Sequence, residues 1–142
     1  MSSTTLKPEN LQQLSARMTD DTWVVACLCA AWCDVCTQYR PGFDELAARH
    51  PDKLFMWIDI EDRADVVGEF DVENFPTLLI QRGDDVVFYG TTLPDAHIAH
   101  RLLTSHANKT EDERRAEAAG KERRAWQGER NLRTALSASK PG

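Results

Sequence analysis

The chain has 142 residues, and its 17 Lys and Arg against 23 Asp and Glu give a net charge of −6. This length suits one domain that buries a core without metal or disulfide staples, so the four cysteines are not a structural scaffold. The acidic balance argues against a nucleic-acid-binding surface, and we expect no nucleic-acid partner.

The N-terminal segment lacks both a basic start and a following apolar stretch, so it does not read as a targeting signal. No segment is apolar for long enough to cross a bilayer, and we therefore expect a cytoplasmic protein without membrane contact. A first helix is predicted from Pro8 to Met18, because Leu11 and Leu14 stand on a polar background and proline is tolerated early in a helix.

The next two elements enclose a cysteine motif. The apolar run from Thr22 to Cys29 is rich in β-branched and aromatic residues, which predicts a buried strand. From Thr37 to His50, apolar side chains recur at spacings of three and four, which predicts one face of a helix. The segment Trp32-Cys33-Asp34-Val35-Cys36 therefore lies on a strand-to-helix turn.

This placement gives each cysteine of the motif a chemical role. The unpaired N–H groups and the positive dipole end of a helix start favour the thiolate form of Cys33. We therefore predict that Cys33 is the attacking group. Cys36 lies three residues on, within disulfide range on the same helix face, and should resolve the mixed disulfide. Without further context, two thiols at this spacing are as typical of half a zinc site or of two unreactive cysteines as they are of a redox pair.

The remaining core elements follow from apolar runs and turn signals. A strand at Leu54 to Ile60 is joined to the first strand by the cysteine-bearing helix, as a parallel crossover. Further on, we expect a short helix at Arg63 to Phe70, two strands at Thr77 to Gln81 and Val86 to Tyr89 forming an antiparallel hairpin, and a helix at about Pro94 to Ser105.

The composition changes after Ser105. Residues 106–142 carry nine Lys and Arg against six Asp and Glu, a net charge of +3, which leaves −9 for residues 1–105. We therefore divide the chain into a domain at 1–105 and a charged, helical or partly disordered extension at 106–142, whose start carries a capping box of Thr110 and Glu113. Because residues 106–142 contain few apolar side chains, we favour the interpretation that this extension is a solvated appendage. The alternative is that the extension is a docking element, either within this protein or for a partner protein. Its three anchors would be Trp126, Leu132 and Leu136.

The segment Trp32-Cys33-Asp34-Val35-Cys36 resembles the active site of the thioredoxin family, and further matches follow in order. Pro41 stands where the family has a kinking proline, and Phe75-Pro76-Thr77 resembles its cis-proline turn. Arg82-Gly83-Asp84-Asp85 resembles its hairpin turn and Gly90 its late glycine. The resemblance covers residues 20–105 and implies an α/β thioredoxin-like fold with a central mixed sheet of four or five strands flanked by helices.

The same resemblance implies a substrate groove framed by Trp32, Phe75, Pro76 and Gly90. A cis bond before Pro76 would present the Phe75 backbone for pairing with an extended substrate segment. The implied function is a thiol-disulfide oxidoreductase that uses Cys33 and Cys36 on protein disulfides, without a cofactor and with an electron donor of the thioredoxin-reductase type.

Three departures from the family pattern affect this function. Cys27 stands where thioredoxins commonly have a buried aspartate that helps to deprotonate the second cysteine, and Trp57 stands where a lysine accompanies it. Asp34-Val35 replaces a frequent Gly-Pro pair. Because both the proton acceptor and the lysine that accompanies it are replaced, we expect Cys36 to resolve mixed disulfides slowly. The rival interpretation is a binding, chaperone-like or redox-regulatory module with weak or no reductase activity.

The two strand cysteines also permit a metal interpretation, because Cys27, Cys29, Cys33 and Cys36 would supply the four sulfurs of a structural zinc site. Cys27 and Cys29 share one face of the strand, whereas the other two lie beyond its end. Four sulfurs closing a tetrahedron are therefore not expected. We interpret Cys27 and Cys29 as small buried apolar residues and predict no metal.

Overall fold

The computed structural model describes residues 3–68, 70, 72, 74–118, 120, 125–127 and 129–138. Its centre is a five-stranded mixed sheet in the order β1-β3-β2-β4-β5. The strands are β1 (Thr4–Thr5), β2 (Trp23–Cys29), β3 (Leu54–Asp59), β4 (Thr77–Arg82) and β5 (Asp85–Thr91). This confirms the predicted α/β thioredoxin-like fold and its upper strand count. The two-residue strand β1 has no sequence periodicity, and it forms because Thr4 pairs in parallel with Met56 of β3.

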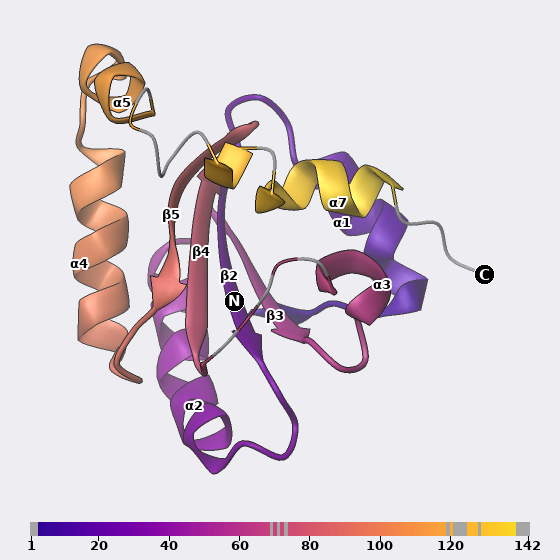
Figure 1. The fold of residues 1–142 in the computed structure, drawn as a ribbon. Coiled ribbons are helices and arrows are strands. Elements are labelled where there is room, and N and C mark those ends of the chain that lie inside the picture. The colour runs from indigo at the N-terminus through magenta and orange to yellow at the C-terminus, as the bar shows by residue number, and fades with distance from the viewer. Residues whose placement is uncertain are drawn as a thin grey trace.

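Helices cover both faces of the sheet (Figure 1). One face carries α1 (Leu11–Arg17), entered through a 3-10 turn η1 at Pro8–Asn10, together with α3 (Ala64–Val67) and α7 (Leu132–Ala138). The other carries α2 (Asp34–Arg49) and α4 (Ala96–Ala107), and α5 (Glu111–Ala118) follows α4. The predicted short helix at Arg63 to Phe70 is only four residues long in the structure.

The alternation of side chains along β2 divides the core into these two layers. Val24, Ala26 and Leu28 face the α1, α3 and α7 side, and Val25, Cys27 and Cys29 face α2 and α4. All six side chains are at most 1% exposed, because β2 is the middle strand and is covered on both faces.

Described residues near the end of the C-terminal extension pack onto the rest of the chain. Leu132 and Leu136 are 0% and 1% exposed within the core on the α1 and α3 side, and half-buried Trp126 contacts the same cluster. The favoured expectation of a solvated appendage is therefore wrong for these residues. The alternative of a docking element is confirmed, with the chain's own core rather than a partner taking up both leucines (Figure 1).

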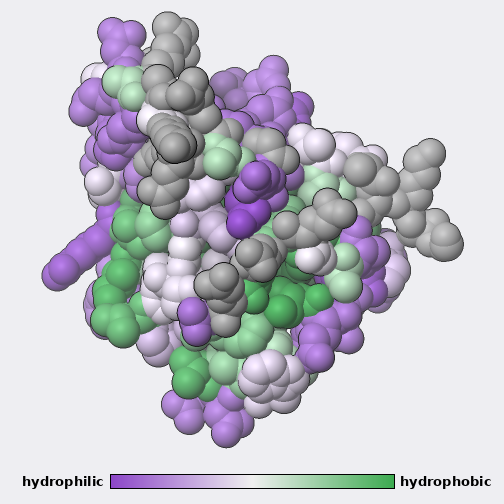
Figure 2. Space-filling view, in the orientation of Figure 1, coloured by the Kyte–Doolittle hydropathy of each residue, from purple (hydrophilic) through white to green (hydrophobic). Residues whose placement is uncertain are grey.

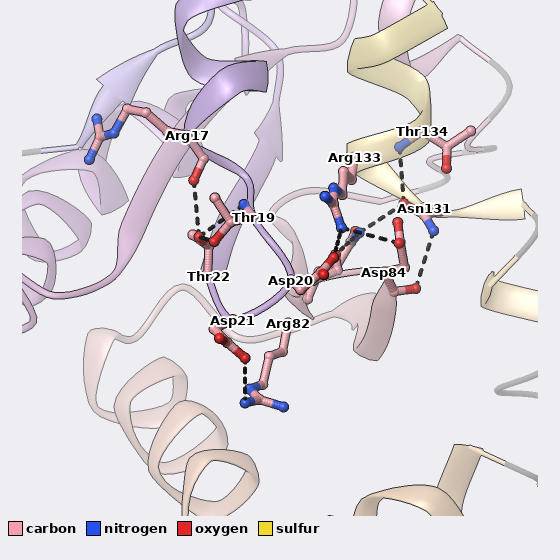
Figure 3. A network of polar contacts seen from close by, with 12 residues as sticks. Arg17, Thr19, Asp20, Asp21, Thr22, Arg82, Asp84, Asn131, Arg133 and Thr134 are labelled. Carbon is pink, nitrogen blue, oxygen red and sulfur yellow. Dashed lines mark hydrogen bonds and ion pairs between the residues drawn. The ribbon is translucent and has the colours of Figure 1, made fainter.

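Polar contacts fix the position of this extension. The amide of the buried Gln81 on β4 donates to Asn131 Oδ1 (2.8 Å), and its oxygen accepts from the Leu132 N–H (2.9 Å). Asn131 Oδ1 also accepts from the Thr134 N–H (3.1 Å), which caps the start of α7. Arg133 pairs with Asp20 (2.8 Å) and with Asp84 of the hairpin turn (3.1 Å) (Figure 3).

The edge of the sheet is covered by the same segment. Gln127 accepts a hydrogen bond from the Val86 N–H (2.8 Å) and donates one to the Val86 carbonyl (3.0 Å), so one side chain satisfies both backbone groups.

The predicted capping box at the start of α5 is confirmed, because the Thr110 and Glu113 side chains each accept from the other residue's N–H at 3.1 Å. Among the described residues, no helix is long and apolar enough to span a membrane.

Candidate functional site

The cysteine motif lies at the junction of β2 and α2, as the sequence predicts. Cys33 is the N-cap of α2 with extended backbone angles, and its N–H donates to the Ala30 carbonyl (3.0 Å). Its own carbonyl accepts from the Thr37 N–H (3.1 Å). The Cys33 side chain is half-buried, whereas Cys36, one turn into the helix, is 1% exposed. Only the first cysteine of the motif is open to solvent.

Cys36 forms its disulfide with Cys29 and not with Cys33. The Cα atoms of Cys29 and Cys36 are 5.9 Å apart, while Cys33 is a free thiol. The expected pairing of Cys33 with Cys36 is thus not the one that this structure contains. The physical reason is direction: Cys36 points from α2 into the sheet, and Cys29 is the last residue of β2 on the face that α2 covers.

Cys27 completes a buried sulfur cluster. Its Sγ lies 3.4 Å from that of Cys29, and since Cys29 is in a disulfide, Cys27 is the donor in this contact. Burial raises the pKa of the Cys27 thiol far above its usual value, and the charge of Arg40 offsets this only in part. Cys27 is therefore a neutral thiol at physiological pH and a poor proton acceptor for Cys36.

Helix α2 places a positive charge beside Trp57, the residue that stands where the family has a lysine. The Arg40 guanidinium lies 4.8 Å from the ring centroid of Trp57, in a cation–π contact. Arg40 also pairs with Asp44 (3.2 Å) and donates to the Thr5 hydroxyl (3.1 Å). Trp57 itself is half-buried, and the guanidinium lies against its ring.

The predicted groove residues lie near the motif at one end of the sheet. Trp32 is 67% exposed and its ring contacts that of Phe75 edge-on, with centroids 5.5 Å apart. The Phe75–Pro76 bond is cis, as the resemblance implied. Gly90 lies on β5 opposite Leu78, two residues before the Thr92 N–H that donates to the Pro76 carbonyl (3.2 Å).

A cavity of about 310 Å³ opens beside Cys36. Its lining includes Thr37 and Arg40 of α2 and Trp57 of β3. The space-filling view shows apolar residues gathered on the lower part of the molecule, over the end of the sheet at which α2 begins (Figure 2). The thiols thus lie next to an apolar surface that an extended polypeptide segment could contact.

The histidines do not take part in this site. His50 Nε2 and His100 Nδ1 lie 3.2 Å apart, at the end of α2 and on α4. Within the described part of the chain, no three His, Cys, Asp or Glu side chains form a group that could hold a metal ion.

The sequence analysis missed the roles of two residues: it interpreted Cys29 as a small buried apolar residue, although Cys29 is in a disulfide, and it did not single out Arg40. Cys29 carried a usable signal, because it shares with Cys27 the strand face that the cysteine-bearing helix must cover. Arg40 carried a similar one, since it lies four residues after Cys36 on the same face of the helix.

A Trp-Cys-x-x-Cys segment between the middle strand and its following helix, with a cis-proline turn at the start of the next strand, defines a thioredoxin-like protein. A family model described as Thioredoxin matches residues 3–103. The chain therefore belongs to the thioredoxin family, whose members are generally thiol-disulfide oxidoreductases.

Relatives agree with this assignment. A protein of Streptomyces coelicolor named "Putative thioredoxin 2" is 30% identical over 124 residues, which is 82% of this chain and 90% of that protein. A thioredoxin H-type of Brassica campestris is 34% identical over 73 residues, which is 51% of this chain. The match spans only 59% of that plant protein's length.

Solved structures show the same fold. A crystal structure of a poplar thioredoxin h superimposes with a TM-score of 0.65 at 23% identity, covering 78% of this chain and all of the poplar chain. A thioredoxin from Nicotiana alata gives 0.63 at 21% identity, covering 75% of this chain and 95% of its own.

Proposed function

We propose that the protein is a thiol-disulfide oxidoreductase that exchanges a Cys33–Cys36 dithiol with disulfides of protein substrates. The observation that carries this proposal is the asymmetry of the motif. Cys33 is free, half-buried and at the N-cap of α2, whereas Cys36 is enclosed one turn later. An accessible thiol at a helix start is the group that attacks, and an enclosed neighbour is the group that resolves.

In the reductive direction, the Cys33 thiolate attacks one sulfur of the substrate disulfide and releases the other as a thiolate. Cys36 then attacks the Cys33 sulfur, which frees the second substrate thiol and leaves a Cys33–Cys36 disulfide. The exposed ring of Trp32 and the half-buried ring of Phe75 flank the site and support binding of an apolar segment. An electron donor of the thioredoxin-reductase type would restore the dithiol.

The test is reduction of insulin disulfides with dithiothreitol as the electron source. The wild-type protein should accelerate insulin precipitation, and Cys33→Ser should abolish the acceleration. Pre-reduced Cys36→Ser, mixed with insulin without dithiothreitol, should instead retain a covalent mixed disulfide that is visible by mass spectrometry and reversed when dithiothreitol is added. A Cys33→Ser protein that works as well as wild type would refute the assignment of the attacking group.

The second candidate function is a binding module of the same fold. It is favoured by Cys27, whose neutral, buried thiol replaces a proton acceptor. A folded wild-type protein that binds unfolded insulin chains but does not reduce them would support this candidate over the first.

A further inference from the structure

Three of the four cysteines form one buried cluster beneath α2. Cys27, Cys29 and Cys36 are each at most 1% exposed, with Cys29 and Cys36 joined and Cys27 Sγ 3.4 Å from Cys29 Sγ. Cys33 is the only described cysteine outside this enclosure. The sulfur of Cys36 thus has two possible disulfide partners, one on each side of the β2–α2 turn.

We propose that Cys29 is a third redox-active cysteine, which takes Cys36 from Cys33 after substrate reduction. This proposal rests on the proposed function, which generates the Cys33–Cys36 disulfide. The Cys29 thiolate attacks the Cys36 sulfur, so that the Cys29–Cys36 bond forms and the Cys33–Cys36 bond breaks. Cys33 leaves as a thiolate, the proton lost by Cys29 passes to solvent or to Cys33, and no electrons are gained or lost.

The position of the cysteines favours this exchange. While Cys36 is paired with Cys33, Cys29 is a buried thiol whose charged form is costly in the apolar cluster, and a disulfide between Cys29 and Cys36 removes this thiol. The thiol left over is Cys33, at the N-cap of α2 and partly open to water, where a negative charge is solvated. The exchange therefore replaces a buried free thiol, that of Cys29, by a solvent-accessible one, that of Cys33.

The product has a different activity from the dithiol. With Cys36 held by Cys29, a mixed disulfide at Cys33 has no resolving cysteine. A second thiolate of the substrate must then attack the substrate sulfur of that mixed disulfide, which forms a new substrate disulfide and returns the Cys33 thiolate. The substrate is rearranged without net reduction. The substrate class is therefore a protein with mispaired disulfides and at least one free thiol.

Chymotrypsin separates the relevant cysteines and makes the pairing measurable. Cleavage after Leu28, Trp32 and Tyr39 gives the peptides 29–32, with Cys29, and 33–39, with both motif cysteines. Reduced protein would be oxidised with glutathione disulfide, quenched in acid, blocked with N-ethylmaleimide while denatured, and digested. We expect peptide 29–32 disulfide-linked to peptide 33–39.

The outcomes separate this inference from the proposed function. An internal disulfide in peptide 33–39, with 29–32 always alkylated, would overturn the inference and leave the oxidoreductase proposal standing. No disulfide in either peptide would overturn both. Because this measurement uses the wild-type protein, it does not depend on the folding of any variant.

A matched pair of variants tests the role of Cys29. In the oxidised wild type, native-state iodoacetamide should label Cys33, and oxidised Cys29→Ala should lose this labelling because Cys33 is then tied to Cys36. Cys27→Ala, which removes the adjacent thiol on the same strand face, should retain it. Equal labelling of oxidised Cys29→Ala and wild type, with both folded by circular dichroism, would contradict the exchange.

The activity is tested with scrambled ribonuclease that carries free thiols, without added reductant. The oxidised wild-type protein should restore ribonuclease activity, and oxidised Cys33→Ala should not. A Cys29–Cys36 cross-link without reactivation would overturn the isomerase part of the proposal.

Discussion

Replacing Leu132 by Ala should destabilise the whole domain, although the residue lies beyond the family-model match at residues 3–103. Leu132 is 0% exposed and begins α7, within the cluster that also holds Leu136 and core residues of α1 and α3. Truncation of a fully buried leucine costs about 2–5 kcal/mol, and we expect about 3 kcal/mol here. The backbone bond from the Leu132 N–H to Gln81 is retained, so the loss reports packing alone.

Urea unfolding followed by circular dichroism measures this loss. With an m-value of about 2 kcal/mol per M, the midpoint should fall by about 1.5 M at unchanged m. Leu93→Ala is the matched control, because Leu93 is 69% exposed and its truncation should change stability by less than about 0.5 kcal/mol. A Leu132→Ala protein as stable as this control would show that α7 is not part of the cooperative core.

Three further predictions concern the site and the fold. Cys27→Asp places a carboxylate beside the sulfur cluster. It should speed the release of substrate from a Cys33 mixed disulfide, measured by stopped-flow kinetics, and should lower stability by several kcal/mol at most. Unchanged or slower release in a folded variant would mean that another group already accepts the Cys36 proton. Gly83→Ala should lower the melting temperature, because Gly83 has φ +57° and an added Cβ would collide with the Asp20 carbonyl oxygen; an unchanged melting temperature would contradict this. Burial, then Lys53 and His100, lower the pKa of His50, so the unfolded chain binds the proton more readily and stability should decline as pH falls from about 6.5 to the folded-state pKa. His50→Gln should flatten this decline in urea titrations, and the exposed His97→Gln should not; equal slopes in both variants would refute the linkage.

Local patterns were sufficient for the elements around the motif. The apolar run of β2 and the three-four spacing from Tyr39 to Ala47 predicted a strand and a helix, because each element must turn an apolar face to the core. The motif between them was placed correctly for the same reason. Strand β1 escaped prediction, since two threonines carry no periodicity and gain their structure from pairing with β3.

The docked extension shows where local patterns fail. In a charge-rich segment, two leucines are too few to predict burial from composition. Leu132 and Leu136 are buried because α1 and α3 leave an apolar surface on the sheet that these side chains cover. Gln81 was predicted only as the end of a strand, yet its amide binds Asn131 from a segment 50 residues away.

The sequence by itself determined the chemistry available to this protein. It placed Cys33 at a helix start and Cys36 one turn later, and it placed Cys27 and Cys29 on one face of the strand before them. Spacing along the chain determines these relations, since a turn of helix and the pleat of a strand have constant geometry. Only the tertiary structure decided which sulfurs meet. The pairing of Cys29 with Cys36 depends on how α2 lies over β2, and this is set by the packing of the whole layer.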